Sequence, residues 1–346
     1  MIIRIQYLRG IAALMVVIFH AFEMLERQTG FGNPFRVGAL GVDVFFVISG
    51  FIIFVAADKS DAKPFDFMLK RLLRIAPLYW ALTLLVAAIA LVRPALLAST
   101  VFDLRHLAAS LLFIPMQHPK LDAIFPVLVP GWTLNYEMAF YFVMASALFA
   151  PRALRPWIVM GVLGAVVTLG HLGAPIPVFY ADAIILEFAL GIAIALVFRA
   201  GFRMAAGTGV LLTLAGFALL IWLEPVELPR FVKAGLPALL IVAGAALGRR
   251  DAAQPAWRPL LLLGDASYSL YLTHALALPV FGKLWVAEGW SMLTGGGLVF
   301  IASAAAVSAL IGVLCYRLVE KPLLGLTART HFARKPPVGA MVGHIR

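Results

Sequence analysis

The feature that most constrains the fold of this chain is the repetition of apolar runs close to twenty residues long. A helix of about 20 residues crosses the ~30 Å hydrocarbon core of a bilayer. With 63% hydrophobic and 13% charged residues, the chain is too apolar for a soluble domain. The expected fold is an all-α polytopic membrane protein with about ten transmembrane helices. The expected spans are 6–25, 39–57, 77–93, 131–150, 156–172, 180–199, 206–223, 232–248, 262–281 and 293–315.

Two further segments complete the expected organisation. Segment 104–116 is too short to span and is expected to form a re-entrant or surface helix covered by protein. Residues 1–325 are expected to form a single transmembrane domain, and residues 326–346 a basic, disordered cytoplasmic tail. Cys315 is the one cysteine, so no intramolecular disulfide forms, and its apolar surroundings indicate plain packing.

The distribution of basic residues predicts the orientation in the membrane. Cytoplasmic loops of membrane proteins are enriched in Lys and Arg. With the N-terminus inside, the inner segments hold 20 of the 28 Lys and Arg, and ten spans return the C-terminus to the same side. The net charge of +11 is then a consequence of topology, and no nucleic-acid partner is expected.

The first span carries an ionisable residue near each end, in the stretch RGIAALMVVIFH. Arg9 and His20 are eleven residues apart, about three helical turns plus 20°, so both leave the same face. The rise between them is about 16 Å, which places Arg9 near the inner boundary and His20 in the outer third of the membrane. The alternatives are that Arg9 only extends to the inner headgroups and that His20 is a satisfied structural histidine.

Three other spans bring titratable residues to the expected depth of His20. Asp43, Glu137 and His274 all fall in the outer third when the spans alternate in direction. A carboxylate close to an imidazole raises its basicity and orients its ring, which suits a general base. Glu23 lies on the same helical face as His20 and is an alternative orienting group.

The inner side is predicted to be basic. Arg71 and Arg74 lie about one turn apart in KRLLRIAP, on a helix entering the membrane from inside. With Arg9 and Lys70 they would form a basic inner mouth, and arginine forks suit phosphate groups. Anchoring of the topology against anionic lipid is the alternative reading of the same residues.

The remaining candidates are expected to play no chemical part. His106 and His118 fall in an outer loop and are expected to be solvated or near the cavity rim. Ser49 precedes Gly50 in mid-membrane, and a helix-packing hydroxyl is expected there rather than a nucleophile. Metal-ligand spacings such as H-E-x-x-H are absent from the sequence, so no metal is expected.

Several ordered blocks give the sequence a family resemblance. They are Arg9 and His20 with ten residues between them, GVDVFFVISGFII (41–53), Arg71 and Arg74 as R-x-x-R, WTLNYEMAFY (132–141) and SYSLYLTH (267–274). Over roughly residues 5–325 the chain resembles the acyltransferase family 3 membrane proteins, which move acyl groups, commonly acetyl, to glycans. The start IQYLRGIAALMVVIFHAF is most similar to the exopolysaccharide-production branch.

The resemblance implies an activity and roles for the residues above. It implies transfer of an acetyl group from acetyl-CoA, with no metal, to a hydroxyl of an exported polysaccharide or its lipid-linked precursor, in a bacterial inner membrane. The implied catalytic residues are His20, Glu137 and Asp43; the implied donor-binding residues are Arg9, Arg71 and Arg74; the implied substrate-binding residues are Trp132, Tyr268, Tyr271 and His274. Direct transfer and an acyl-histidine intermediate both remain open.

A proton-coupled transporter or flippase is the competing interpretation. Buried His, Asp and Glu also build proton relays in carriers. Carriers of that kind are commonly made of two related halves with interrupted helices, and no such internal symmetry is present in this sequence. A carrier would also leave the inner R-x-x-R unexplained.

Overall fold

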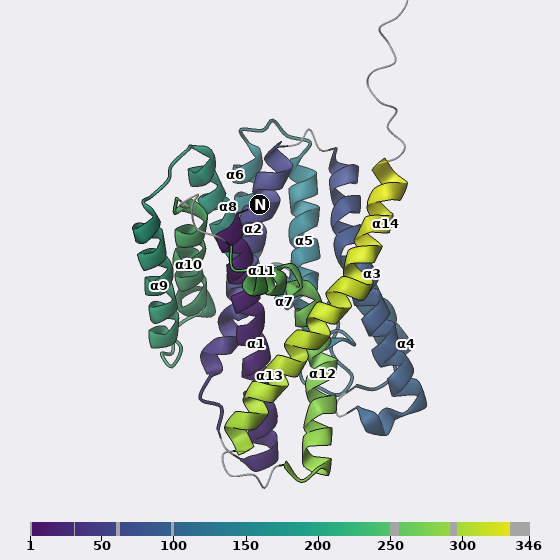
Figure 1. Ribbon diagram of the computed structural model, residues 1–346. Helices are drawn as coiled ribbons and strands as arrows, with labels where there is room; N and C mark the ends of the chain where they lie inside the picture. Colours follow the sequence, from purple (N-terminus) through teal and green to yellow (C-terminus); the bar gives the residue numbers. More distant parts are fainter. Residues whose placement is uncertain are drawn as a thin grey trace, which may run out of the picture.

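The protein is a bundle of helices (Figure 1). The computed structural model describes residues 2–30, 32–59, 63–97, 100–249, 256–290 and 296–332. Within these ranges the regular structure is helical, with isolated β-bridges but no strand. The helices are α1 (Ile3–Thr29), α2 (Gly41–Lys59), α3 (Pro64–Val92), α4 (Leu104–Leu111), α5 (Trp132–Ala147), α6 (Arg155–His171), α7 (Val178–Ala181), α8 (Leu186–Arg199), α9 (Ala206–Leu223), α10 (Leu236–Leu247), α11 (Arg258–Asp265), α12 (Ser267–Ala287), α13 (Gly296–Cys315) and α14 (Lys321–Phe332).

The all-helical membrane fold predicted from the apolar runs is confirmed. Among the described residues, six helical stretches are long and apolar enough to cross a membrane, and two shorter apolar helices accompany them. Each of the ten expected spans contains a helix, and α4 occupies the segment expected to hold a short one. The count of ten crossings and the orientation of the termini remain predictions.

Two helices extend further than the apolar pattern indicated. Helix α3 begins at Pro64, before the expected span 77–93 and before Arg71, because proline suits the first helical turn and Asp66 complements the helix dipole there. Helix α13 passes through the π-helical segment Tyr316–Glu320 into α14. Figure 1 shows α13 and α14 crossing the bundle together as one long diagonal. Of the expected tail, residues 333–346 lie outside the described residues.

Helices α2 and α8 touch backbone to backbone at two glycines. A Cβ atom added at Gly50 would lie 2.1 Å from the Phe188 carbonyl oxygen, and one added at Gly191 would lie 2.2 Å from the Val47 carbonyl oxygen. Real Cβ atoms do not approach oxygen so closely. Small residues at such a seam let two membrane helices pack at short range.

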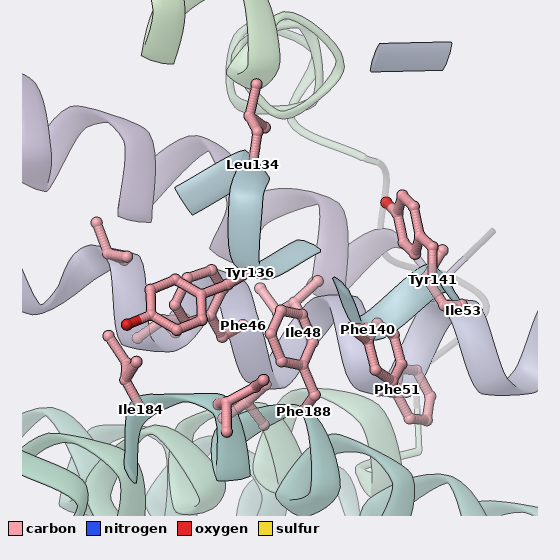
Figure 2. Close-up of a cluster of buried hydrophobic side chains, with 14 of the residues drawn as sticks. Phe46, Ile48, Phe51, Ile53, Leu134, Tyr136, Phe140, Tyr141, Ile184 and Phe188 are labelled. Atoms are coloured by element: carbon pink, nitrogen blue, oxygen red, sulfur yellow. The ribbon is translucent and has the colours of Figure 1, made fainter. Parts of the chain in front are cut away.

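Aromatic rings fill the space between α2, α5 and α8 (Figure 2). The ring of Phe188 lies 4.8 Å from that of Phe46 and stacks on Phe140 at 4.4 Å. All three side chains are buried. Because each helix contributes a large rigid ring, their packing fixes the axial position of α5 and hence of Glu137 on it.

The outer surface of the bundle is apolar on several helices. Large exposed side chains include Leu211 and Trp222 on α9, Leu298 on α13 and Phe142 on α5. A soluble protein rarely exposes continuous apolar area of this kind. These surfaces suit contact with lipid, as expected for a membrane protein.

Candidate active site

An internal pocket lies where five helices meet. It is a cavity of about 260 Å³ lined from α1, α2, α3, α5 and α12. Its walls are largely apolar, and its polar lining residues are Arg9, Ser49, Arg71, Arg74, Thr133, Glu137, Tyr141, Ser267, Tyr268 and Tyr271. Of the four basic residues expected at the inner mouth, Arg9, Arg71 and Arg74 therefore meet, with a carboxylate among them, while Lys70 does not line the pocket.

The three arginines differ in how many of their hydrogen-bond donors are already used by other protein groups. Arg74 forms an ion pair with Glu320, which is 2% exposed, and lies 5.7 Å over the Tyr268 ring. Ser269 also donates to the Glu320 carboxylate. Arg74 is thus held in place by its own counter-ion, with less hydrogen-bonding capacity left for a ligand.

Arg9 and Arg71 retain more unused donors. Arg9 donates to the Gln6 side chain at 3.2 Å, and Gln6 in turn donates to Asp265. The Nε atom of Arg71 is buried and has no hydrogen-bond partner among the described residues. A buried, unpaired guanidinium nitrogen is costly, and a bound anion would remove that cost.

Glu137 belongs to the arginine pocket. Its carboxylate accepts a hydrogen bond from Ser49 Oγ at 3.2 Å and another from the Tyr141 hydroxyl. The sequence placed Glu137 at the depth of His20, as its orienting group, but these contacts lie at the pocket with Arg9 and Arg71. In this position Glu137 adds a carboxylate to the lining of the arginine pocket.

His20 lies beyond this pocket on the same helix as Arg9. Its Nδ1 atom lies 2.8 Å from the Val16 carbonyl oxygen, which can only accept. Nδ1 is therefore the protonated nitrogen, and Nε2 keeps its lone pair. The His20 ring is 5.0 Å from that of His274 on α12, so two of the four titratable groups expected at one depth do meet.

Tyr271 links the pocket to the two histidines. It lines the pocket, its hydroxyl lies 3.2 Å from Thr133 Oγ1, and its ring is 5.7 Å from the ring of His274. The pocket and the histidine pair are thus neighbours along α12.

Asp43 is engaged in an ion pair that the sequence did not reveal. Both of its oxygens accept from Arg230, each at 2.9 Å, and the carboxylate is fully buried. Glu187, also fully buried, lies close to the same pair. Arg230 lies between two apolar runs of the sequence, and its position there does not indicate that it pairs with Asp43.

The other expected substrate-binding residues lie partly in packing contacts. Trp132 packs edge-on against Phe46 and Tyr136, with ring centroids 6.3 and 6.0 Å away. Tyr268 lines the pocket, and its hydroxyl donates to the Ile75 carbonyl oxygen at 2.7 Å. Tyr268 is therefore the better placed of the two to touch a ligand in the pocket.

The outer-loop histidines, expected to be solvated or near the cavity rim, are buried. His106 and His118 are 1% and 3% exposed, and their rings lie 5.1 Å apart. His118 Nδ1 accepts from the backbone of Lys120 and Leu121, while His106 Nε2 donates to the Phe125 carbonyl. Burial, together with His106, lowers the pKa of His118. The pair pins the loop before α5.

These features define a class of protein, a multi-pass membrane protein with a charged internal pocket. Comparison with known families then identifies it: residues 2–317 match the family described as "Acyltransferase domain", and the chain belongs to that family. It is therefore an enzyme, a membrane acyltransferase. No group of three or more His, Cys, Asp or Glu that could hold a metal occurs in the described part of the chain.

Two characterised relatives align over most of the chain. The "Exopolysaccharide production protein ExoZ" of Rhizobium meliloti (strain 1021) is 38% identical over 314 residues, 89% of this chain and 94% of that protein. The "Acyltransferase MdmB" of Streptomyces mycarofaciens is 28% identical over 361 residues, 93% of this chain and 91% of that protein. No solved structure gives a significant match.

Proposed function

We propose that this enzyme transfers an acetyl group from acetyl-CoA to a hydroxyl of an exported polysaccharide or its lipid-linked precursor. The observation that carries the proposal is the convergence of Arg9, Arg71 and Arg74 on one internal pocket next to a histidine pair. The name of the ExoZ relative supports a glycan acceptor. No nucleic acid or metal takes part.

The arginine pocket is proposed to hold the phosphates of the donor. Arg71 and Arg9 supply free guanidinium donors, and Arg74, fixed by Glu320, adds charge at close range. Phosphate oxygens would satisfy the buried Nε of Arg71. The acyl-bearing arm then runs past Tyr271 to His20.

His20 is proposed to act as the general base. Its Nε2 lone pair takes the proton of the acceptor hydroxyl while the oxygen forms a bond to the thioester carbonyl carbon. The carbon–sulfur bond then breaks, and the leaving thiolate takes the proton back from the imidazolium. An acyl-histidine intermediate, formed by attack of Nε2 itself, uses the same lone pair and stays an alternative.

The remaining predicted residues are proposed to support His20 and the arginine pocket. His274 lies against the His20 ring, Tyr271 and Tyr268 line the pocket, and Trp132 is proposed to contact the acceptor. Glu137 is proposed to set the charge of the arginine pocket. Asp43, held by Arg230, is proposed to position α2 rather than to transfer a proton.

The membrane arrangement follows from the same reading. We infer ten crossings in a single transmembrane domain over residues 1–325, with both termini in the cytoplasm of a bacterium and the protein in its inner membrane. The bias of basic residues towards the inner segments supports this orientation. The arginine pocket would then be reached by acetyl-CoA from the cytoplasm.

The test is acetyl transfer from radiolabelled acetyl-CoA by the purified protein in proteoliposomes, given a polysaccharide or lipid-linked glycan extract. Incorporation that is lost in His20→Ala, with the fold intact, supports the mechanism. Equal incorporation by the variant removes His20 as the base. If neither protein incorporates label, binding of acetyl-CoA decides: binding that is lost in Arg71→Ala keeps the transferase, and absence of binding favours the carrier.

A further inference from the structure

A second basic cavity lies at one end of the bundle. It has a volume of about 410 Å³ and is bounded by the start of α1, the end of α8 and the end of α10. Its lining residues are Ile2, Ile3, Arg4, Phe198, Arg203, Ala245, Ala246, Gly248 and Arg249. Apart from three arginines, the described lining is apolar and carries no acidic side chain. Such a site has a strong net positive charge.

This cavity is distinct from the active-site pocket. Arg4 and Arg9 are five residues apart on α1, so their side chains leave the helix about 140° apart. Each cavity is lined by one of them and not by the other. The two basic sites therefore open on different sides of the first helix.

One of the arginines has room made for it, and another is fixed in position before any ligand binds. The Nη1 atom of Arg4 lies 2.6 Å from the place where a Cβ would stand at Gly248, so the absence of a side chain there makes room for it. The face of the Arg203 guanidinium lies 3.6 Å from the Phe198 ring centroid, and its Nη1 donates to the carbonyls of Phe198 and Phe202. Preorganised guanidinium groups lose little freedom on binding an anion.

The cavity also contains a polar atom without a partner. The Nη1 atom of Arg4 is buried and makes no hydrogen bond to any described residue. A buried donor of this kind costs free energy unless an acceptor fills the site. Three guanidinium groups in an otherwise apolar cavity favour an anion with several oxygen atoms, each of which can accept a hydrogen bond.

We propose that this cavity binds a phosphate group, supplied by the headgroup of an anionic membrane phospholipid or by phosphate in solution. The surroundings favour the lipid. The site lies at helix ends, where headgroups meet a membrane protein, and basic pockets between transmembrane helices recognise such headgroups. The apolar side chains of Val197 and Phe202 are exposed beside it and would contact the acyl chains.

The experiment measures lipid binding by the purified full-length protein in detergent, using native mass spectrometry. Dioleoylphosphatidylglycerol, dioleoylphosphatidylcholine and inorganic phosphate are titrated separately against wild type, Arg4→Gln and Arg249→Gln. Arg249 is exposed, so its variant keeps the test decisive if Arg4→Gln does not fold. Arg258→Gln is the matched control, because Arg258 is an exposed arginine on α11 that lines neither cavity.

For the wild type we expect one molecule of phosphatidylglycerol to bind at least fivefold more tightly than phosphatidylcholine. Each cavity variant is expected to weaken that binding about fivefold, and Arg258→Gln to leave it unchanged. If inorganic phosphate binds with the same dependence on Arg4 and Arg249 while the two lipids bind alike, the phosphate site stands and its ligand is soluble. Equal binding of every ligand by all four proteins overturns the proposal.

Discussion

The imidazole ring of His20 lies 5.0 Å from that of His274, tilted by 53°. The two residues come from α1 and α12, which are far apart in the chain and run side by side in the bundle. The Nδ1 hydrogen bond to Val16 leaves the Nε2 lone pair of His20 as the basic atom. A proton taken up by His20 would therefore lie on a ring that has a second imidazole as its neighbour.

The first prediction concerns His20 itself. We expect His20→Ala to lower acetyl transfer by a factor of about 10²–10⁴, the usual contribution of a general base. The control is His171→Ala, because His171 makes the same 2.8 Å contact from Nδ1 to the carbonyl oxygen four residues earlier but is exposed at the end of α6. Equal losses in the two variants would contradict the assignment.

The second prediction separates the pocket arginines. Arg71→Ala is expected to raise the KM for acetyl-CoA about tenfold or more, because it removes a donor that no described residue satisfies. Arg74→Ala is expected to raise this KM and also to lower the unfolding temperature, because it leaves the buried carboxylate of Glu320 without its counter-ion. Steady-state kinetics and thermal unfolding in detergent measure both effects. Identical behaviour of the two variants would refute the distinction.

The third prediction concerns the ion pair between Asp43 and Arg230. Asp43 is fully buried and Arg230 is 38% exposed. We therefore expect Arg230→Gln to lower the free energy of unfolding by about 2 kcal/mol, less than for a pair in which both residues are buried. A double-mutant cycle with Asp43→Asn checks this by thermal unfolding. The double variant should lose less than the two single variants together. Strict additivity would show that the pair contributes nothing.

The fourth prediction tests the glycine seam. Gly50→Ala is expected to destabilise the protein by more than about 2 kcal/mol, since its methyl group would meet the backbone of Phe188. Gly161→Ala on α6 is the matched control, because a Cβ there has no neighbour within 4 Å. Alanine is the better helix former, so this control should be neutral or stabilising. Thermal unfolding of both variants gives the comparison.

The fifth prediction concerns the loop pinned by His106 and His118. The folded-state pKa of His118 lies below its ordinary value of 6.5, so the unfolded chain binds a proton first as the pH falls. Stability from this residue is therefore present above about pH 6.5 and is lost below it. Wild type should lose thermal stability between pH 7.5 and 5.5 more steeply than His118→Asn. Parallel curves would exclude a contribution from His118.

The membrane fold and the shared side of Arg71 and Arg74 could be predicted because both depend on local pattern. Apolar length determines where a helix can span, and the R-x-x-R spacing puts Arg71 and Arg74 on one side of α3 whatever surrounds them. The common depth of His20 and His274, whose rings meet in the structure, followed from assigning each span a direction. These predictions used no information about which helices touch.

The partners of the buried charges could not be predicted, because they depend on which helices are neighbours. The pairing of Arg74 with Glu320 requires α3 to lie against the π-helical segment that follows α13, and that of Asp43 with Arg230 requires α2 to lie near the start of α10. Glu137 shares its predicted depth with His20, but its direction around α5 turns it to Ser49 and Tyr141. Depth can be read from a sequence, whereas the rotation of one helix against another comes from side-chain packing.

The contact of Gly50 with Phe188 and of Gly191 with Val47 has a mechanical consequence. Carbonyl oxygens occupy the space where side chains would stand, so α2 and α8 cannot slide past each other or roll apart without losing the whole seam. We expect α2 and α8 to stay fixed relative to each other while other helices move. We therefore expect any opening that admits donor and acceptor to the pocket to come from its other lining helices, α1, α3, α5 and α12.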